Sequence, residues 1–140
     1  MGDSSAMAVL QYAVEYLGID NIIVAGHFGC GGVKTTFTNN NFGNLESWLH
    51  QIREIKYKFQ DELNGDQSVD EPKLVKLNVQ EQVHRIARTP FVEKAWKEGR
   101  NLKIFGVIYD ISTGKLISAE EEIIGHQDQD LDEDETFYIW

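Results

Sequence analysis

A histidine and a cysteine close together in a glycine-rich stretch are the residues of this sequence best suited to metal chemistry. His27 and Cys30 form a His-x-x-Cys pair within the stretch Gly26-His27-Phe28-Gly29-Cys30-Gly31-Gly32. Imidazole and thiolate are both good zinc donors, and a two-residue gap in a tight turn lets them converge on one tetrahedral ion. Glycine permits the close backbone folding that such a turn needs. The pair therefore indicates part of a zinc site.

The two residues alone leave another interpretation open. Structural zinc sites have four protein ligands and catalytic sites usually have three. The other nearby histidines, His50 and His84, fall on expected helices without a characteristic ligand spacing. A histidine in a turn hydrogen bond and a cysteine packed as a small hydrophobe are the alternative. Cys30 is also the only cysteine, so an intramolecular disulfide is impossible and a reducing compartment is expected.

The hydrophobic pattern predicts the elements that position this turn. The apolar run at residues 21–24 precedes the turn and is typical of a buried parallel strand. Open parallel sheets bind ligands at the carboxyl ends of their strands. Pro72 is expected at the first position of a helix. The other expected elements are a first helix ended by Gly18 with Met7, Leu10, Val14 and Leu17 inward, helices at about 45–63, 72–87 and 90–96, and a hairpin of strands at 102–111 and 115–119.

This order of elements indicates an α/β fold, with a short parallel sheet, an antiparallel edge hairpin and covering helices. We expect one domain over residues 1–120. Residues 121–140 are expected to be an acidic, solvated and mobile tail, because acidic residues crowd into it and no Lys or Arg follows Lys115. Trp48 and Trp96 fall on apolar helix stripes and are expected in the core.

Composition narrows the partners and the location. The formal net charge is -10 and the chain has no basic stripe, so nucleic acid is not an expected partner. No stretch approaches the roughly 20 apolar residues that a membrane helix needs, and the first residues lack the basic region of a secretory signal. A cytoplasmic location, or an organelle matrix, is expected.

The wider sequence resembles the β-class carbonic anhydrases over about residues 5–118. The matching segments, in the family's order, are 8–14 (AVLQYAV), 22–33 (IIVAGHFGCGGV), 44–49 (NLESWL), 77–83 (LNVQEQV), 95–96 (AW) and 106–111 (GVIYDI). The resemblance implies a partial β-carbonic anhydrase fold, the carboxyl-terminal portion of the family's domain.

The resemblance also implies zinc as cofactor, and the reversible hydration of carbon dioxide to bicarbonate by zinc-bound hydroxide as the activity. Family members hold zinc with two Cys, one His and, in many structures, one Asp; His27 and Cys30 match the His and the second Cys. Gly31 and Gly32 match backbone of the substrate pocket. Tyr109 matches a position that helps bind an inhibitory bicarbonate in some bacterial-type members, and packing between layers as an ordinary strand residue is its alternative role.

The sequence departs from the family's pattern before the turn. The family's other motif, Cys-x-Asp-x-Arg, lies on an earlier strand, whereas the 26 residues before His27 contain neither Cys nor Arg. The resemblance therefore carries over no catalytic residue beyond the zinc pair. A truncated chain, a natural short form that has abandoned catalysis, and a sheet completed by a second chain or a swapped copy are three explanations. A non-catalytic, oligomerising or regulatory protein is the alternative function.

An incomplete sheet predicts association. An open strand edge and uncovered apolar faces invite pairing with another chain, so a homo-oligomer or a completing chain is expected. If one chain holds zinc with four ligands of its own, Asp3, His50 and His126 are the first residues to consider for the remaining positions.

Overall fold

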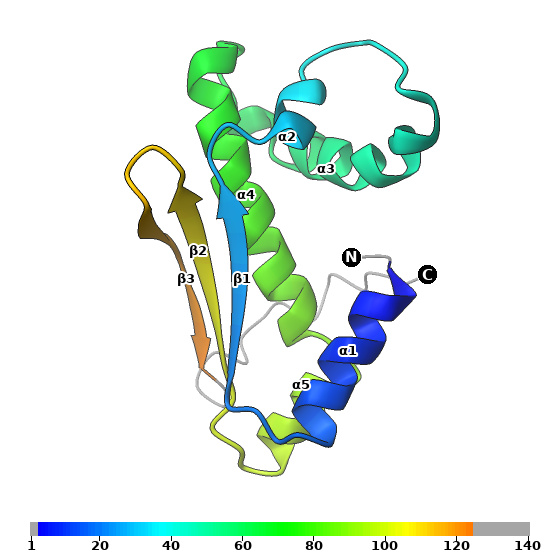
Figure 1. The fold of residues 1–140 in the computed structure, drawn as a ribbon, viewed down its shortest axis with the longest axis vertical. Coiled ribbons are helices and arrows are strands. Elements are labelled where there is room, and N and C mark those ends of the chain that lie inside the picture. The colour runs from blue at the N-terminus through cyan, green and yellow to red at the C-terminus, as the bar shows by residue number, and fades with distance from the viewer. Residues whose placement is uncertain (1–2, 125–140) are drawn as a thin grey trace.

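The computed structural model describes the backbone of residues 3–124 of the 140-residue chain, and its side chains as far as residue 119. The elements, in order, are α1 (Ser4–Glu15), β1 (Asn21–His27), α2 (Gly31–Thr35), α3 (Glu46–Lys58), α4 (Gln67–Ala87), α5 (Pro90–Lys97), β2 (Lys103–Asp110) and β3 (Lys115–Ile124), with short 3-10 turns at Gly43–Leu45 and Gln60–Glu62 (Figure 1). They form one sheet and one layer of helices, which confirms the predicted α/β fold.

The sheet has the order β1-β2-β3, with β1 parallel to β2 and β3 antiparallel to β2. Asn21–His27 pair residue for residue with Lys103–Tyr109. His27 therefore lies beside Tyr109 at the carboxyl ends of the two parallel strands. Within residues 3–124, no other strand pairs with the second side of β1, which makes β1 an open edge.

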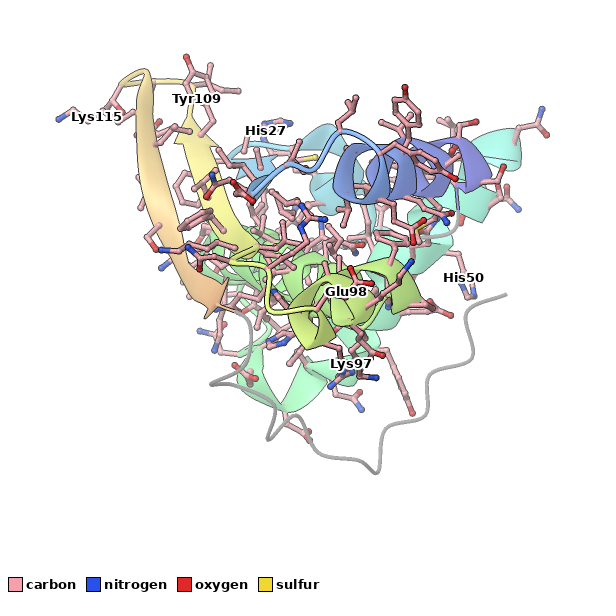
Figure 2. The ribbon with its side chains drawn as sticks, turned by 90° about the horizontal axis from the view of Figure 1, so that it is seen from below. His27, His50, Lys97, Glu98, Tyr109 and Lys115 are labelled. Carbon is pink, nitrogen blue, oxygen red and sulfur yellow. The ribbon has the colours of Figure 1, made fainter. Side chains whose placement is uncertain are left out.

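The helices lie on one face of this sheet, as both views show (Figures 1 and 2). The long helix α4 contacts all three strands. Side chains alternate along β1: Ile22 is buried against the helices, whereas Ile23, on the opposite face, is 64% exposed. Tyr109 and Leu116, which face each other across β2 and β3, are exposed as well. The described residues leave the second face of the sheet uncovered.

Two apolar clusters meet along α4. One joins α1 and α5 to the first half of the parallel strands, and the other joins α2 and α3 to their carboxyl ends. The fully buried members include Val14, Val83 and Ile104 in the first cluster, and Ile55, Leu74 and Ile108 in the second. The second cluster is the one that supports the His27–Cys30 turn.

Two glycines let α4 approach the sheet closely. A Cβ at Gly26 would lie 2.6 Å from Val79 Cγ2, and a Cβ at Gly106 would lie 3.0 Å from Val79 Cγ1. Val79 is itself buried, so its side chain has little room to move away. The position of α4 against the last residues of β1 therefore depends on the absence of side chains at these two positions.

The start of α4 differs from the prediction. The helix begins at Gln67 rather than at Pro72. Asp66 accepts a hydrogen bond from the Ser68 backbone N–H and caps the helix, and the buried Asp70 carboxylate accepts from two backbone N–H groups of the preceding loop. These two carboxylates outweigh the proline signal, and Pro72 lies inside the helix on its exposed side, where it costs one helical hydrogen bond.

Three apolar side chains test the expected core. Trp96 is buried as predicted, and its indole N–H donates to the Leu102 carbonyl at 2.8 Å. The predictions for Leu17 and Trp48 are wrong, because both are more than half exposed. Leu17 lies beyond the end of α1, where helical spacing no longer directs it inward. Trp48 lies on α3 at the edge of the helical layer.

The last strand is longer than expected. β3 continues to Ile124, past the predicted strand end at residue 119 and past the expected domain boundary at residue 120. Backbone pairing with β2 extends as far as Lys103 opposite Ile124 and accommodates the acidic residues of this stretch at the sheet's outer strand. Residues 125–140, most of the expected tail, lie outside the described residues. Among residues 3–124, no helix is long and apolar enough to span a bilayer.

Paired glycine substitutions test the close approach of α4. Gly26→Ala should lower the free energy of unfolding by about 1–3 kcal/mol, because the new methyl group overlaps the buried Val79. Gly31→Ala is the matched control: nothing lies within 4 Å of its Cβ position, so its effect should stay within about 0.5 kcal/mol. Denaturant unfolding measures both. Equal stabilities for the two variants would contradict the packing described here.

Candidate functional site

His27 is the last residue of β1 and lies at the carboxyl end of the parallel pair. The next residue continues the attachment to β2, because the Phe28 N–H donates to the Tyr109 carbonyl at 3.4 Å. Figure 2 shows His27 and Tyr109 at the same end of the sheet. The backbone of β2 thus holds the beginning of the turn, at the place where open α/β sheets bind their ligands.

The hydrogen bond made by His27 determines which ring nitrogen is available to a metal. His27 Nδ1 lies 3.0 Å from the Phe28 carbonyl oxygen. A carbonyl can only accept, so Nδ1 carries the proton and Nε2 carries the lone pair. A backbone carbonyl that fixes the tautomer in this way is a common feature of histidine metal ligands. The imidazole is exposed, so Nε2 is accessible.

Cys30 lies at the start of α2, as the residue that precedes its first turn. It has extended backbone dihedrals, and its side chain makes no capping hydrogen bond. The thiol is free of any disulfide and half-buried. It packs against the second apolar cluster, which includes Val33. The Lys34 N–H donates to the Cys30 carbonyl at 2.9 Å and closes the first turn of the helix. The backbone around Cys30 is thus defined, while its sulfur remains available as a ligand.

Helix α2, which Cys30 precedes, is held by α3. Lys56 Nζ donates to the Thr36 carbonyl at 3.0 Å, and Arg53 Nη1 donates to the Thr38 carbonyl at 3.2 Å. These cations lie at the carboxyl end of α2, where the helix dipole favours positive charge. Burial lowers the pKa of Lys56, the Arg53 guanidinium lowers it further, and Asp70 opposes them in part.

The two glycines assigned to the substrate pocket lie in the first turn of α2, in different surroundings. Gly31 has open space where a side chain would be, whereas a Cβ on Gly32 would lie 2.6 Å from Trp48 Cη2. Sequence reasoning gave Trp48 only a core role and missed this contact. No sequence pattern predicts this contact. Gly32 and Trp48 lie on different helices, and helical or strand periodicity relates only residues of the same element.

Tyr109 lies beside His27, on the uncovered face of the sheet. Its side chain is 43% exposed, so the expectation that it packs between layers is wrong; in the described residues no second layer covers this face. Its hydroxyl reaches toward the hairpin turn, 3.9 Å from the Cβ position of Gly114. The bicarbonate role that the resemblance implies for Tyr109 stays a prediction.

The other named donors do not join the pair. Asp3 accepts from the Ala6 N–H and caps α1, and His50 Nδ1 lies 3.3 Å from Glu54 Oε1 on α3. Figure 2 shows His50 well apart from His27. His126 lies outside the described residues. Among the described side chains, which end at residue 119, no group of three or more His, Cys, Asp or Glu gathers as a metal site.

The two donors fit zinc in kind. A neutral imidazole with an accessible Nε2 and a thiol outside any other bond are both zinc ligands. They are also too few, since even a catalytic zinc usually has three protein ligands. The described side chains therefore include two donors that suit zinc, and further ligands would be needed to complete a site.

Comparison with known proteins places the whole arrangement in context. A family model described as carbonic anhydrase matches residues 1–116. A carbonic anhydrase of Candida albicans is 34% identical over 122 residues, which are 84% of this chain and 43% of that protein. The chain spans about half the length of the curated relatives it matches.

Solved structures agree with the sequence match. A β-carbonic anhydrase from Coccomyxa, in complex with acetazolamide, superposes with a TM-score of 0.82 at 32% identity, over 88% of this chain and 57% of that one. A structure from work on two tetrameric β-carbonic anhydrases of Sordaria macrospora superposes with a TM-score of 0.77 at 26% identity, over 86% of this chain and 62% of that one.

Metal titration tests the half site. The 140-residue chain by itself should take up far less than one zinc per chain at micromolar metal, because two ligands leave the coordination shell incomplete. His27→Ala and Cys30→Ser should each weaken the residual affinity by roughly tenfold or more, the loss known for even indirect partners of a metal. His50→Ala is the control and should change nothing. One tightly bound zinc per isolated chain, measured by elemental analysis after dialysis, would contradict the half-site description.

Proposed function

Because this chain belongs to the β-class carbonic anhydrase family, we propose that it supplies the His–Cys half of a zinc site that reversibly hydrates carbon dioxide to bicarbonate. The observation that carries the proposal is the position of His27 at the end of β1 with Cys30 three residues later, where Nδ1 of His27 is bonded to the Phe28 carbonyl and the Cys30 side chain makes no capping bond. Zinc, when bound, supplies a Lewis acid that lowers the pKa of a coordinated water.

The remaining ligands, in this proposal, come from a segment outside these 140 residues. The open edge of β1 supports this source, because a parallel strand added along Asn21–His27 would bring its own carboxyl end next to the turn. The resemblance assigns the family's Cys-x-Asp-x-Arg motif to such a strand. The segment can precede this chain in a longer protein or belong to a second polypeptide.

The residues of this chain orient and hold the site. The Phe28 carbonyl keeps the His27 ring in one tautomer, and the Tyr109 carbonyl holds the turn to β2. The first turn of α2 presents Gly31, which has open space at its Cβ position and lets a small substrate approach the backbone. The uncovered Tyr109 side chain lies beside His27 on the same face.

We also propose that the protein works as an oligomer. None of the described residues covers the second face of the sheet, which carries the exposed Ile23, Tyr109 and Leu116. A solved structure similar to this chain comes from work on tetrameric β-carbonic anhydrases. Exposed apolar groups and an open strand edge both favour burial against another chain.

A complementation assay tests the activity. In a stopped-flow pH assay, the 140-residue chain alone should hydrate carbon dioxide no faster than buffer, because its zinc site is incomplete. A segment bearing Cys-x-Asp-x-Arg, supplied by fusion or in trans, should produce zinc-dependent hydration. His27→Ala in that complex should return the rate to that of buffer, because zinc loses a ligand.

His50→Ala is the matched control in the same complex and should leave the rate unchanged. Hydration that stays at the buffer rate after zinc and the segment have demonstrably bound would refute the proposed activity, and would favour a non-catalytic member of the family. Zinc-dependent hydration by the bare chain that disappears in Cys30→Ser would refute the need for an added segment.

Sedimentation velocity tests association. The chain should form dimers or larger assemblies at micromolar concentration. Ile23→Lys places a charge on the uncovered face and should shift the population toward monomer. Val69→Lys, at an exposed position of α4 on the other side of the molecule's core, should not. A compact monomer for the unmodified chain across micromolar concentrations would count against the proposal.

A further inference from the structure

Trp48 is highly exposed and yet makes a close contact with α2, the helix that follows the His27–Cys30 turn. The side chain is 54% exposed, unusual for an indole on an otherwise amphipathic helix. The six-membered part of its ring nevertheless lies against the backbone of α2. A Cβ on Gly32 would be 2.6 Å from Cη2 and 2.7 Å from Cζ3 of this ring, and 3.5 Å from Ile52 Cδ1. The indole therefore occupies the space that a side chain at Gly32 would need.

The short helix α2, which Trp48 contacts, needs tertiary contacts to stay helical. α2 has five residues, and helices that short are unstable without tertiary contacts. Lys56 and Arg53 hold its carboxyl end through the carbonyls of Thr36 and Thr38. At the amino-terminal end, α3 approaches Gly32 most closely through Trp48, with Ile52 at the longer distance. The two ends of α2 are thus attached to α3 by different means.

We propose that Trp48 is a positioning residue that fixes the first turn of α2 and thereby places the Cys30 sulfur. Gly32 is two residues after Cys30, and the Lys34 N–H bonded to the Cys30 carbonyl closes the same turn. A shift of that turn away from α3 moves Cys30 relative to His27, which is attached to β2 instead. The consequence for zinc rests on the proposed function; the positioning of the turn does not.

The exposure of Trp48 also distinguishes its positioning role from ordinary core packing. Val33 and Ile52 are buried in the second apolar cluster, so their truncation would leave cavities and destabilise the whole domain. Trp48 is more than half exposed, so its removal leaves little cavity. Loss of the indole should therefore loosen α2 locally while the remainder of the domain keeps its stability.

Hydrogen exchange and thiol labelling of the 140-residue chain test the positioning without metal. In Trp48→Ala, the Lys34 amide should exchange about tenfold faster, and a bulky thiol reagent should label Cys30 about tenfold faster at fixed pH. Cys30 is the only cysteine, so labelling reports this turn alone. The control is Tyr57→Ala, an aromatic on α3 that is 73% exposed; it should change neither rate. Amides of the α4 core should keep their rates in both variants.

A double substitution tests the contact itself. Gly32→Ala in the unmodified chain should speed Cys30 labelling by about tenfold, because the methyl group forces the ring and the turn apart. In the Trp48→Ala background, the same change should speed labelling further by less than about twofold, because the overlapping atoms are gone. Equal factors in the two backgrounds, or unchanged exchange in Trp48→Ala, would overturn the inference.

Cobalt binding separates this inference from the proposed function. In the complex completed with the added segment, the thiolate-to-cobalt absorption band reports the bond to Cys30. Trp48→Ala should weaken cobalt affinity roughly tenfold and Tyr57→Ala should not, as for other positioning groups of metal ligands. Cobalt that binds Trp48→Ala as tightly as the parent refutes the positioning of the ligand. Absence of cobalt binding in the parent, with the exchange and labelling effects intact, refutes the metal function and leaves the positioning of the turn supported.

Discussion

The packing of α4 onto the sheet is the constraint on which the other features depend. Val79 lies against Gly26 of β1 and Gly106 of β2, so a Cβ would overlap it at Gly26 and would be tightly crowded at Gly106. This contact brings the helix and the ends of both parallel strands into one unit, and the buried clusters on either side of it join α1, α5, α2 and α3 to the same helix. The chain leaves β1 after His27, the residue that follows Gly26, so the origin of the turn to Cys30 is set by this packing.

In residues 3–124, that packing leaves one face and one edge of the sheet open. Apolar side chains on the open face, among them Ile23 and Leu116, are exposed, whereas Ile22 and Ile108 on the opposite face are buried. His27 lies next to this open edge, because β1 both presents His27 and has the side on which no described strand pairs. A further strand along β1 would pair with this edge and, in the proposed function, would bring the remaining zinc ligands.

The two donors of the candidate zinc site are held by different neighbours. His27 depends on β2 through the Tyr109 carbonyl, and Cys30 depends on α2, which depends on α3 through Trp48, Arg53 and Lys56. A change in the angle between α3 and the sheet would alter the separation of the two donors. Metal binding and the packing of α3 are therefore expected to influence each other, in accordance with the coupling of metal sites to folding.

The sequence by itself determined the class of fold, the His27–Cys30 pair and the family, because local signals carry them: an apolar run before a glycine-rich turn, helical periods and a continuous set of motifs. It also placed Trp96 in the core, where periodicity and burial agree. Tertiary structure decided what depends on contacts between distant segments. The Asp70 carboxylate bound to the preceding loop started α4 before Pro72, and pairing with β2 carried β3 to Ile124. The contact of Trp48 with Gly32 has no signature along the chain, because it depends on the angle at which α3 crosses α2.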